Sequence, residues 1–261
     1  MFYSFKIILG VSLLLQVGAK KVKTKVIRNT TEPKWFFTED FPIEVIKGQD
    51  LKIEIFDYDF IGENDFLGKI IIPTSMVADQ GSIDKMWTEL ENVKSGKIQL
   101  SLTWLQATLD KSILQDSQRN CQAQCLLHIF LDSCHNLKSS QPSPFVKFYI
   151  RNKKESKLSR TKYYTNDPIF EEGFEFTVID PYTDDLHIKV IDSGHKDAEM
   201  GYLKLPISTI LESPNMECKQ QKFSLTGKGV FGEIELAISI RCLKKVEKKN
   251  KTYSLPRHLI S

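Results

Sequence analysis

The chain has 261 residues, of which 41% are hydrophobic and 26% are charged, and its formal net charge is +3. This length accommodates two modest domains that each bury a core, and the composition is that of a soluble globular protein rather than a disordered chain. The net charge is too small to indicate a partner, so the distribution of the charges is more informative than their sum.

The first 19 residues, MFYSFKIILGVSLLLQVGA, allow two interpretations. They contain one lysine, an apolar run and Val17-Gly18-Ala19, which satisfies the small-residue rule for signal-peptide cleavage. Sequons at Asn29 and Asn250 would also suit a secreted chain, and the run is too short to span a bilayer. The repeat described below favours the other interpretation, in which residues 13–18 form an internal β-strand.

The next segment carries lysines at alternate positions of a predicted strand. Lys21, Lys23 and Lys25 are separated by Val22 and Thr24, and side chains at alternate positions of a strand point to the same face. Three ammonium groups are therefore expected on one face of this strand.

Residues 56–68, FDYDFIGENDFLG, crowd acidic residues beside an apolar strand. Because like charges at this spacing repel one another, either water solvates each carboxylate or a cation gathers them. Ca²⁺ takes about six to eight oxygen ligands, and clustered carboxylates supply them. An EF-hand does not fit, because Ile61 and Gly68 occupy two of its ligand positions. A solvated acidic turn and a different kind of cation site both remain open at this point.

The second half of the chain repeats the first. TEPKW at 31–35 matches NDPIF at 166–170, and DLKIEIFD at 50–57 matches DDLHIKVID at 184–192, both with an offset of 135 residues. In each copy apolar and polar residues alternate, and Gly, Pro, Asn and Asp interrupt the alternation every ten residues or so. This pattern predicts an all-β fold of two antiparallel β-sandwiches in tandem.

The two copies differ at their starts. The second begins with CLLHIFLDSCHNL at 125–137, a strand that runs into a loop, and the same offset places its counterpart before Met1. The first domain, residues 1–106, is therefore expected to lack its opening strand and first loop. A linker at 107–122 and a complete second domain at 123–242 follow. Residues 243–261 are rich in lysine and are predicted to be a disordered tail.

The second copy also carries concentrated positive charge. Lys147 and Arg151 lie on one face of a predicted strand, and the adjoining hairpin RNKKESKLSRTK adds Lys153, Lys154, Lys157, Arg160 and Lys162. Positively charged strands in corresponding places of both copies favour binding to an anionic surface.

The sequence gives little support to other classes of function. The chain has no G-x-S-x-G, P-loop or H-E-x-x-H motif, so an enzyme is not expected. It has no zinc spacing and no recognised nucleic-acid-binding signature. Five cysteines, an odd number without metal-ligand spacing, are typical of reduced thiols in the cytosol.

These motifs together resemble tandem C2 domains, and specifically the first two C2 domains of extended synaptotagmins. The resemblance covers residues 13–242, and its most specific element is the D-x-D-x5-D pattern followed by Phe66-Leu67-Gly68. Members of that family tether the endoplasmic reticulum to the plasma membrane and move glycerolipids between them. Their membrane hairpin, lipid-carrying domain and later C2 domain have no counterpart in these 261 residues, so the resemblance implies the docking part of that activity.

The resemblance also implies sites. It assigns Asp57, Asp59 and Asp65 to a Ca²⁺ site in the third loop of the first domain, weakened because Gly10-Val11-Ser12 stands where loop-one aspartates would fall. In the second domain Gly194 replaces the second aspartate, so calcium independence is expected.

The implied partners are anionic phospholipids and phosphoinositides at a membrane surface, and other C2-containing family members. The implied location is cytoplasmic, peripheral on the plasma membrane or its contacts with the endoplasmic reticulum. A protein-interaction scaffold without lipid binding, and a secreted C2-like protein, are the alternatives.

Overall fold

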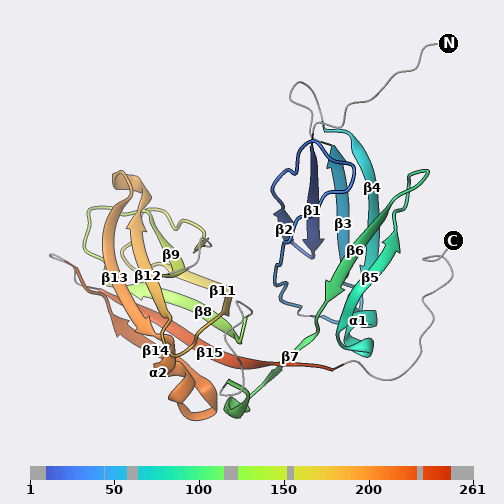
Figure 1. Cartoon of the computed structure of the whole chain (residues 1–261). Coiled ribbons are helices and arrows are strands. Elements are labelled where there is room, and N and C mark those ends of the chain that lie inside the picture. Colours follow the sequence, from blue (N-terminus) through green and yellow to red (C-terminus); the bar gives the residue numbers. More distant parts are fainter. Residues whose placement is uncertain are drawn as a thin grey trace. The chain divides into compact units, whose positions relative to one another are not determined.

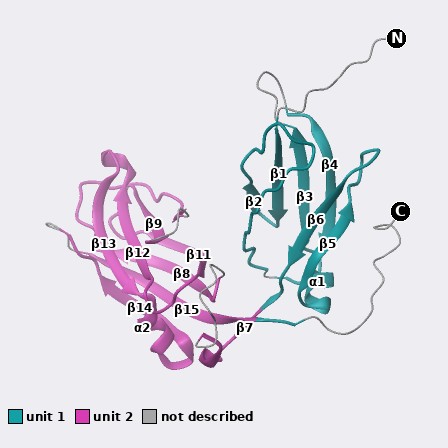
Figure 2. Ribbon diagram, in the orientation of Figure 1, with its two compact units in different colours: residues 1–105, 245–261 teal, residues 106–244 magenta. Residues whose placement is uncertain are grey.

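A computed structural model describes residues 10–43, 45–57, 64–114, 123–151, 156–227 and 232–247. The chain forms two compact units: residues 1–105 together with 245–261, and residues 106–244 (Figure 2). Both are built from antiparallel strands, as the alternation of apolar and polar residues predicted (Figure 1). In the part of the chain that the structure describes, no helix is long and apolar enough to cross a bilayer.

The first unit contains a four-stranded sheet in the order β2-β1-β3-β4 and a separate β5-β6 pair. Its elements are β1 (Val11–Val17), β2 (Lys20–Lys23), β3 (Asp50–Asp57), β4 (Phe66–Pro73), α1 (Thr74–Gln80), β5 (Ile83–Glu89) and β6 (Lys97–Leu102). Alternate residues such as Leu13, Ile53 and Ile70 are buried in its core. The prediction that residues 13–18 form an internal strand is confirmed, because β1 lies between β2 and β3 (Figure 1).

The second unit is a fuller sandwich, with one sheet in the order β10-β9-β12-β13 and the other in the order β11-β8-β15-β14. Its strands are β7 (Leu105–Thr108), β8 (Cys125–His135), β9 (Pro144–Ile150), β10 (Ser156–Leu158), β11 (Ile169–Val178), β12 (Asp185–Asp192), β13 (Ala198–Pro206), β14 (Glu217–Ser224) and β15 (Glu233–Lys245). Its helices are α2 (Ile207–Glu212) and the 3-10 turns η1 (Lys111–Leu114), η2 (Ser193–His195) and η3 (Pro214–Met216).

Strand β8 accounts for the main difference between the units. It lies between β11 and β15 and buries Leu127, Ile129 and Leu131 completely. Among the described residues of the first unit no strand takes this place, and residues 34–43, which correspond to β11 after subtracting 135, form no strand. A strand is stable only where its backbone groups find a partner, and the described residues of the first unit supply no strand partner beside residues 34–43.

The cores of the two units reflect this difference. In β15, Leu236 and Ile238 are almost fully buried, whereas their counterparts Leu100 and Leu102 remain partly exposed. Trp35 and the residues that follow it still pack against the first core, although they form no strand. The expected fold class, two C2-type sandwiches with the opening strand lacking from the first, agrees with the described residues.

The predicted disordered tail, residues 243–261, starts too early in the sequence. Strand β15 continues through Lys245, so residues 243–245 are strand rather than disordered chain. Beyond the strand, Val246 belongs to the first unit, where its amide donates to the Trp104 carbonyl at 2.9 Å and its own carbonyl accepts from the Ser82 amide and hydroxyl, both at 3.1 Å. Residues 248–261 lie outside the described part.

The predicted linker is also partly structured. Strand β7 pairs with β15, and the turn η1 follows it. The remainder of the predicted linker, residues 115–122, lies outside the described residues. The pairing of β7 therefore begins the second unit earlier than the expected boundary at residue 123.

Candidate functional site

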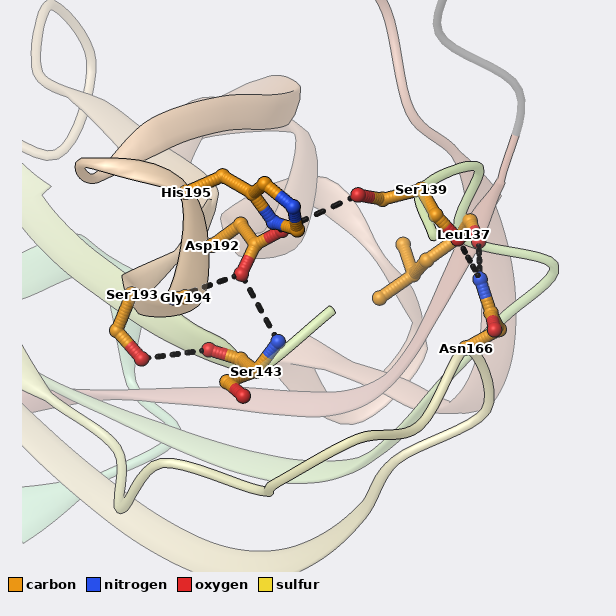
Figure 3. A network of polar contacts seen from close by, with 8 residues as sticks. All are labelled: Leu137, Ser139, Ser143, Asn166, Asp192, Ser193, Gly194 and His195. Carbon is orange, nitrogen blue, oxygen red and sulfur yellow. Dashed lines mark hydrogen bonds and ion pairs between the residues drawn. The ribbon is translucent and has the colours of Figure 1, made fainter. Parts of the chain in front are cut away.

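The end of β12 in the second unit holds a buried carboxylate within a network of hydrogen bonds (Figure 3). Asp192 is 1% exposed. Its Oδ1 accepts from the amides of Ser143 and Gly194, both at 2.9 Å. Its Oδ2 accepts from the Ser139 hydroxyl at 3.2 Å and lies 2.7 Å from Nδ1 of His195. Donors from this chain therefore surround both carboxylate oxygens.

These donors keep Asp192 ionised. Burial is the largest single influence and favours the neutral acid, but the hydrogen bonds from Ser143, His195 and Gly194 together outweigh it, so the pKa of Asp192 lies below its ordinary value. A protonated His195 would add a favourable charge to the same contact. The donors thus stabilise the carboxylate in the way that a bound cation would.

The loops around Asp192 are fixed by local contacts. The Asn166 side chain donates to the carbonyls of Leu137 and Ser139, which holds the loop that follows β8 (Figure 3). A Cβ atom at Gly194 would lie 3.2 Å from Oδ1 of Asp192. An aspartate there would crowd and repel this carboxylate, so glycine suits the network better than a second ligand would.

The corresponding carboxylate of the first unit has fewer partners. Asp57 ends β3, is 0% exposed, and corresponds to Asp192 through the offset of 135. Its Oδ1 is 3.4 Å from the amide of Gly10, at the long limit of a hydrogen bond. Its Oδ2 is buried and has no donor among the described residues. A buried unpaired carboxylate oxygen is costly, which makes it a candidate ligand atom for a cation.

The predicted calcium ligands are only partly brought together. The amide of Asp57 donates to the carbonyl of Asp65 at 2.8 Å, so these two residues close the ends of one loop. Asp59, between them, lies outside the described residues, and no group of three metal-ligating side chains occurs within the part that is described. The orphan oxygen of Asp57 fits a cation, whereas the complete ligand set stays a prediction.

The second unit carries a cationic surface on one sheet. Val146, Phe148 and Ile150 of β9 are buried, so the residues between them point away from the core. The outer face of this sheet carries Lys147, Tyr149, Arg151, His187, Lys189, Tyr202 and Lys204. We call this set the outer face. Two acidic side chains, Glu199 and Asp185, pair with Lys189 at 2.7 Å and Lys204 at 2.8 Å. Positive charge is therefore in excess.

The rings of Tyr149, His187 and Tyr202 form a row across the outer face. The ring of Tyr149 stacks on His187 with centroids 4.9 Å apart and an interplanar angle of 12°. Nδ1 of His187 shares a hydrogen bond with the hydroxyl of Tyr202, and Nζ of Lys189 lies 5.9 Å from the Tyr202 ring centroid. His187 is only 8% exposed, and burial is the main reason that its pKa lies below the ordinary value.

The structure also shows where the predicted cations of the β9–β10 hairpin lie. Nζ of Lys157 lies 5.3 Å from the Phe176 ring centroid, Nζ of Lys162 lies 6.0 Å from that of Phe170, and Arg160 contacts Glu172 at 3.4 Å. Their partners belong to β11 of the other sheet, so these three cations do not share the outer face. Lys153 and Lys154 lie outside the described residues.

In the first unit the predicted lysines lie along an exposed edge. Lys21 and Lys23 are exposed on β2, the outermost strand of its sheet, and Lys25 is exposed just beyond its end. Strand β2 corresponds to β10 through the repeat. The neighbouring Lys20 forms an ion pair instead, because its Nζ lies 2.6 Å from a carboxylate oxygen of Glu39.

Sequence reasoning missed part of the outer face. Lys189, Lys204 and His187 were not among the residues predicted as lipid contacts. The alternation of residues 186–190 does place His187 and Lys189 opposite the buried positions. Their grouping with Tyr149 and Tyr202, however, depends on the register of three strands.

Comparison with known proteins gives consistent matches. The C2 domain family matches residues 8–90 and 125–223. Extended synaptotagmin-2 of Mus musculus is 32% identical over 245 residues, covering 88% of this chain and 28% of the relative. The Homo sapiens protein is also 32% identical, with 88% of this chain and 26% of the relative covered. The chain thus spans just over a quarter of the length of these curated relatives.

Solved structures agree with this result. A calcium-bound structure of the tandem C2 domains, named A and B, of Extended-Synaptotagmin 2 matches with a TM-score of 0.79 and 33% identity, covering 91% of this chain and 88% of that one. A structure that contains the SMP domain of Extended-Synaptotagmin 2 together with the same two C2 domains matches with a TM-score of 0.81 and 32% identity, covering 92% of this chain and 52% of that one.

Proposed function

Because this chain belongs to the C2 domain family, with a tandem pair similar to the two C2 domains solved for Extended-Synaptotagmin 2, we propose that it binds anionic phospholipid membranes without catalysing a reaction. The relatives reported above are extended synaptotagmins. The binding surfaces are the outer face of the second unit and the lysine edge formed by Lys21, Lys23 and Lys25.

One observation carries this proposal: Lys147 and Lys189 are directly opposite each other on the paired strands β9 and β12. Like charges in this arrangement destabilise a sheet, and Arg151 and Lys204 add to the same face. An anionic surface relieves this repulsion. Each basic side chain near such a surface contributes roughly 1 kcal/mol. Glu199 and Asp185 already pair with Lys189 and Lys204, so the excess charge of this face corresponds to Lys147 and Arg151, which give modest affinity without calcium.

The predicted cations of the β9–β10 hairpin have a secondary part in this proposal. Lys157, Arg160 and Lys162 lie toward the edge and the other sheet, so they extend the positive potential around the edge and do not contact the same lipids as Lys147. Phosphoinositides, which carry several charges each, are the preferred anionic lipids under this proposal.

We further propose that the first unit alone binds Ca²⁺, and weakly, through Asp57, Asp59 and Asp65. The orphan Oδ2 of Asp57 supports this assignment. Three carboxylates from one loop provide few of the roughly six to eight oxygens that the ion prefers, so affinity near the millimolar range is expected. When bound, the ion would add positive charge to the loop. In the second unit, the hydrogen-bond donors around Asp192 take the place of a calcium ion.

The family relationship suggests a role as the docking part of a lipid-transfer tether. Such a chain would act at the cytoplasmic surface of the plasma membrane or at its contacts with the endoplasmic reticulum. Other C2-containing proteins of the same family are its proposed protein partners. The two extended synaptotagmin-2 relatives are much longer than this chain, so these roles are proposals about the complete assembly.

Vesicle flotation tests the proposed function. The chain is mixed with neutral phosphatidylcholine vesicles, or with vesicles that also contain phosphatidylserine or a phosphoinositide. We expect binding only to the anionic vesicles, weakened by salt. The double variant Lys147→Gln/Lys189→Gln is expected to bind at least about tenfold more weakly, since two charges of roughly 1 kcal/mol each are lost.

A matched control removes the same charge elsewhere. Lys219 and Lys222 are exposed on β14 of the other sheet, so Lys219→Gln/Lys222→Gln is expected to bind as the parent chain does. If the two double variants lose the same affinity, the outer face is not the binding surface. Equal binding to neutral and anionic vesicles would instead favour the protein-interaction scaffold.

A further inference from the structure

We propose that His187 links membrane binding by the outer face to proton uptake, so that binding to anionic membranes tightens as the pH falls. This inference rests on the proposed function, because it concerns the regulation of the same cationic surface. Three features of the structure carry it: the position of the imidazole, its unpaired nitrogen, and the charges around it.

The imidazole of His187 lies within the outer face between two aromatic residues. Tyr149 is directly opposite it on β9 and stacks on its ring, while Tyr202 on β13 holds Nδ1 through a hydrogen bond. These contacts fix the orientation of the ring. They also leave Nε2 as the nitrogen that can exchange a proton without breaking a contact that already exists.

Nε2 of His187 is buried and has no hydrogen-bond partner among the described residues. An unpaired polar atom in a residue that is more than nine-tenths buried is unusual in folded proteins. In the tautomer whose Nδ1 donates to the Tyr202 oxygen, Nε2 holds the lone pair that gains the proton, and the hydrogen bond on the other side survives. The new N–H and the new positive charge then favour an anionic oxygen close to the surface.

The surrounding charges hold His187 neutral in the free protein. Burial lowers its pKa most, and the nearby Lys204, Arg151 and Lys189 lower it further, whereas Asp185 acts in the opposite direction. The charged and titratable groups on the same face are Lys147, Tyr149 and Arg151 from β9, Asp185 and Lys189 on β12, and Glu199, Tyr202 and Lys204 on β13.

An anionic membrane changes this balance. Lipid phosphates offset the repulsion from Lys189, Lys204 and Arg151 and add attraction for the imidazolium, so the pKa of His187 rises on binding. By linkage, a group whose pKa rises on binding takes up a proton, and affinity increases as the pH falls through the range between the free and bound values. Histidine titrates between about pH 5 and pH 8, where this response is expected.

The test measures vesicle binding of the whole chain from about pH 8 to pH 5. Phosphatidylglycerol in a phosphatidylcholine background is the suitable anionic lipid, because its charge is constant over this range. One added charge at a membrane strengthens binding by about fivefold, so we expect the parent chain to bind about fivefold more tightly at the acidic end. His187→Gln is expected to abolish this pH response, whatever its affinity at the alkaline end.

His128→Gln is the matched control. His128 belongs to the same unit but lies on β8 of the other sheet, with its side chain half exposed beside Glu175. This variant is expected to keep the pH response. If His187→Gln responds to pH as strongly as the parent chain, or if both variants lose the response equally, the inference is wrong.

A second measurement covers the case in which His187→Gln folds poorly. The titration of the His187 ring in the parent chain is followed by NMR with and without bicelles that contain phosphatidylglycerol. We expect its pKa to be higher with the bicelles, and an unchanged pKa would overturn the inference. If the parent chain binds no anionic vesicle at any pH, the proposed function itself fails. Binding without a pH response refutes only the role of His187.

Discussion

The two units stabilise a buried aspartate carboxylate in different ways. Each places a buried aspartate at the end of corresponding strands, Asp57 on β3 and Asp192 on β12. In the second unit, backbone amides, a hydroxyl and an imidazole surround the carboxylate. In the first unit, one oxygen has a single long contact and the other has no donor within the described part. A carboxylate at this position therefore needs either internal donors or an external cation.

The outer surfaces of the two main sheets also differ. Where the second unit has Lys189 facing Lys147, the first has Glu54 facing Leu14 and Lys69 across the paired strands. The first unit thus mixes charge on this surface, where Lys52 of β3 is also exposed, and carries further exposed lysines at the β2 edge. Under the proposed function, the second unit is therefore expected to be the stronger electrostatic membrane contact and the first the one that responds to calcium.

The largest effect is expected from Asp192→Ala. This change leaves the buried amide of Ser143 and the partly buried amide of Gly194 without an acceptor, and such losses cost about 3 kcal/mol of unfolding free energy. Urea denaturation, followed by a probe for the second unit, measures the change. Asp57→Ala is the matched comparison in the first unit and is expected to cost much less, because it removes a carboxylate that is poorly paired without calcium.

This comparison also predicts a dependence on pH. The pKa of Asp192 is lowered from its ordinary value of 3.8, so its stabilising contribution is complete above that value and is lost as the pH falls through the lower folded value. An equal loss of stability for Asp57→Ala and Asp192→Ala near neutral pH would contradict the proposed difference between the two aspartates.

A smaller effect is expected from calcium itself. Ca²⁺ that binds only the folded first unit stabilises that unit by about 1.4 kcal/mol at roughly ten times its dissociation constant. Thermal unfolding at millimolar calcium should therefore shift for the first unit and not for the second. Asp57→Asn should remove the shift, whereas magnesium at the same concentration serves as the ionic control. A shift in the second unit would show that the internal donors do not exclude the ion.

The smallest effect is expected from Glu54→Lys, which makes the first unit resemble the second. The substitution replaces an acidic side chain opposite Leu14 on the outer surface of the first sheet. Added positive charge of this kind should strengthen binding to phosphatidylserine vesicles about fivefold, measured by flotation. Unchanged binding would indicate that this surface of the first unit does not face the membrane.

Much of the fold could be predicted from the sequence because the repeat has a constant offset. The repeat was enough to identify residues 13–18 and 50–57 as strand segments, whereas the pairing of β1 with β3 is known only from the structure. The end of β15 was predicted wrongly, because Lys244 and Lys245 have the composition of a charged tail, although the strand continues through both. Local composition does not show that a following residue, Val246, finds partners in the first unit.

The candidate sites were harder to predict than the fold. The direction of the Lys157 side chain depends on the register of a three-residue strand, in which Lys157 lies opposite the buried Phe148. The contact between Asp192 and His195 depends on a short 3-10 turn. Charge and spacing identified the acidic position at 192, but the choice between a metal and internal donors required the three-dimensional arrangement.

The position of Val246 in the chain determines when some hydrogen bonds of the first unit can form during synthesis. Trp104 and Ser82 bind a residue that the ribosome adds only after every strand of the second unit. The hydrogen bonds of Trp104 and Ser82 with Val246 therefore form only after β15 has been synthesised. A fusion or truncation near the carboxyl terminus would consequently disturb the part of the protein that is synthesised first.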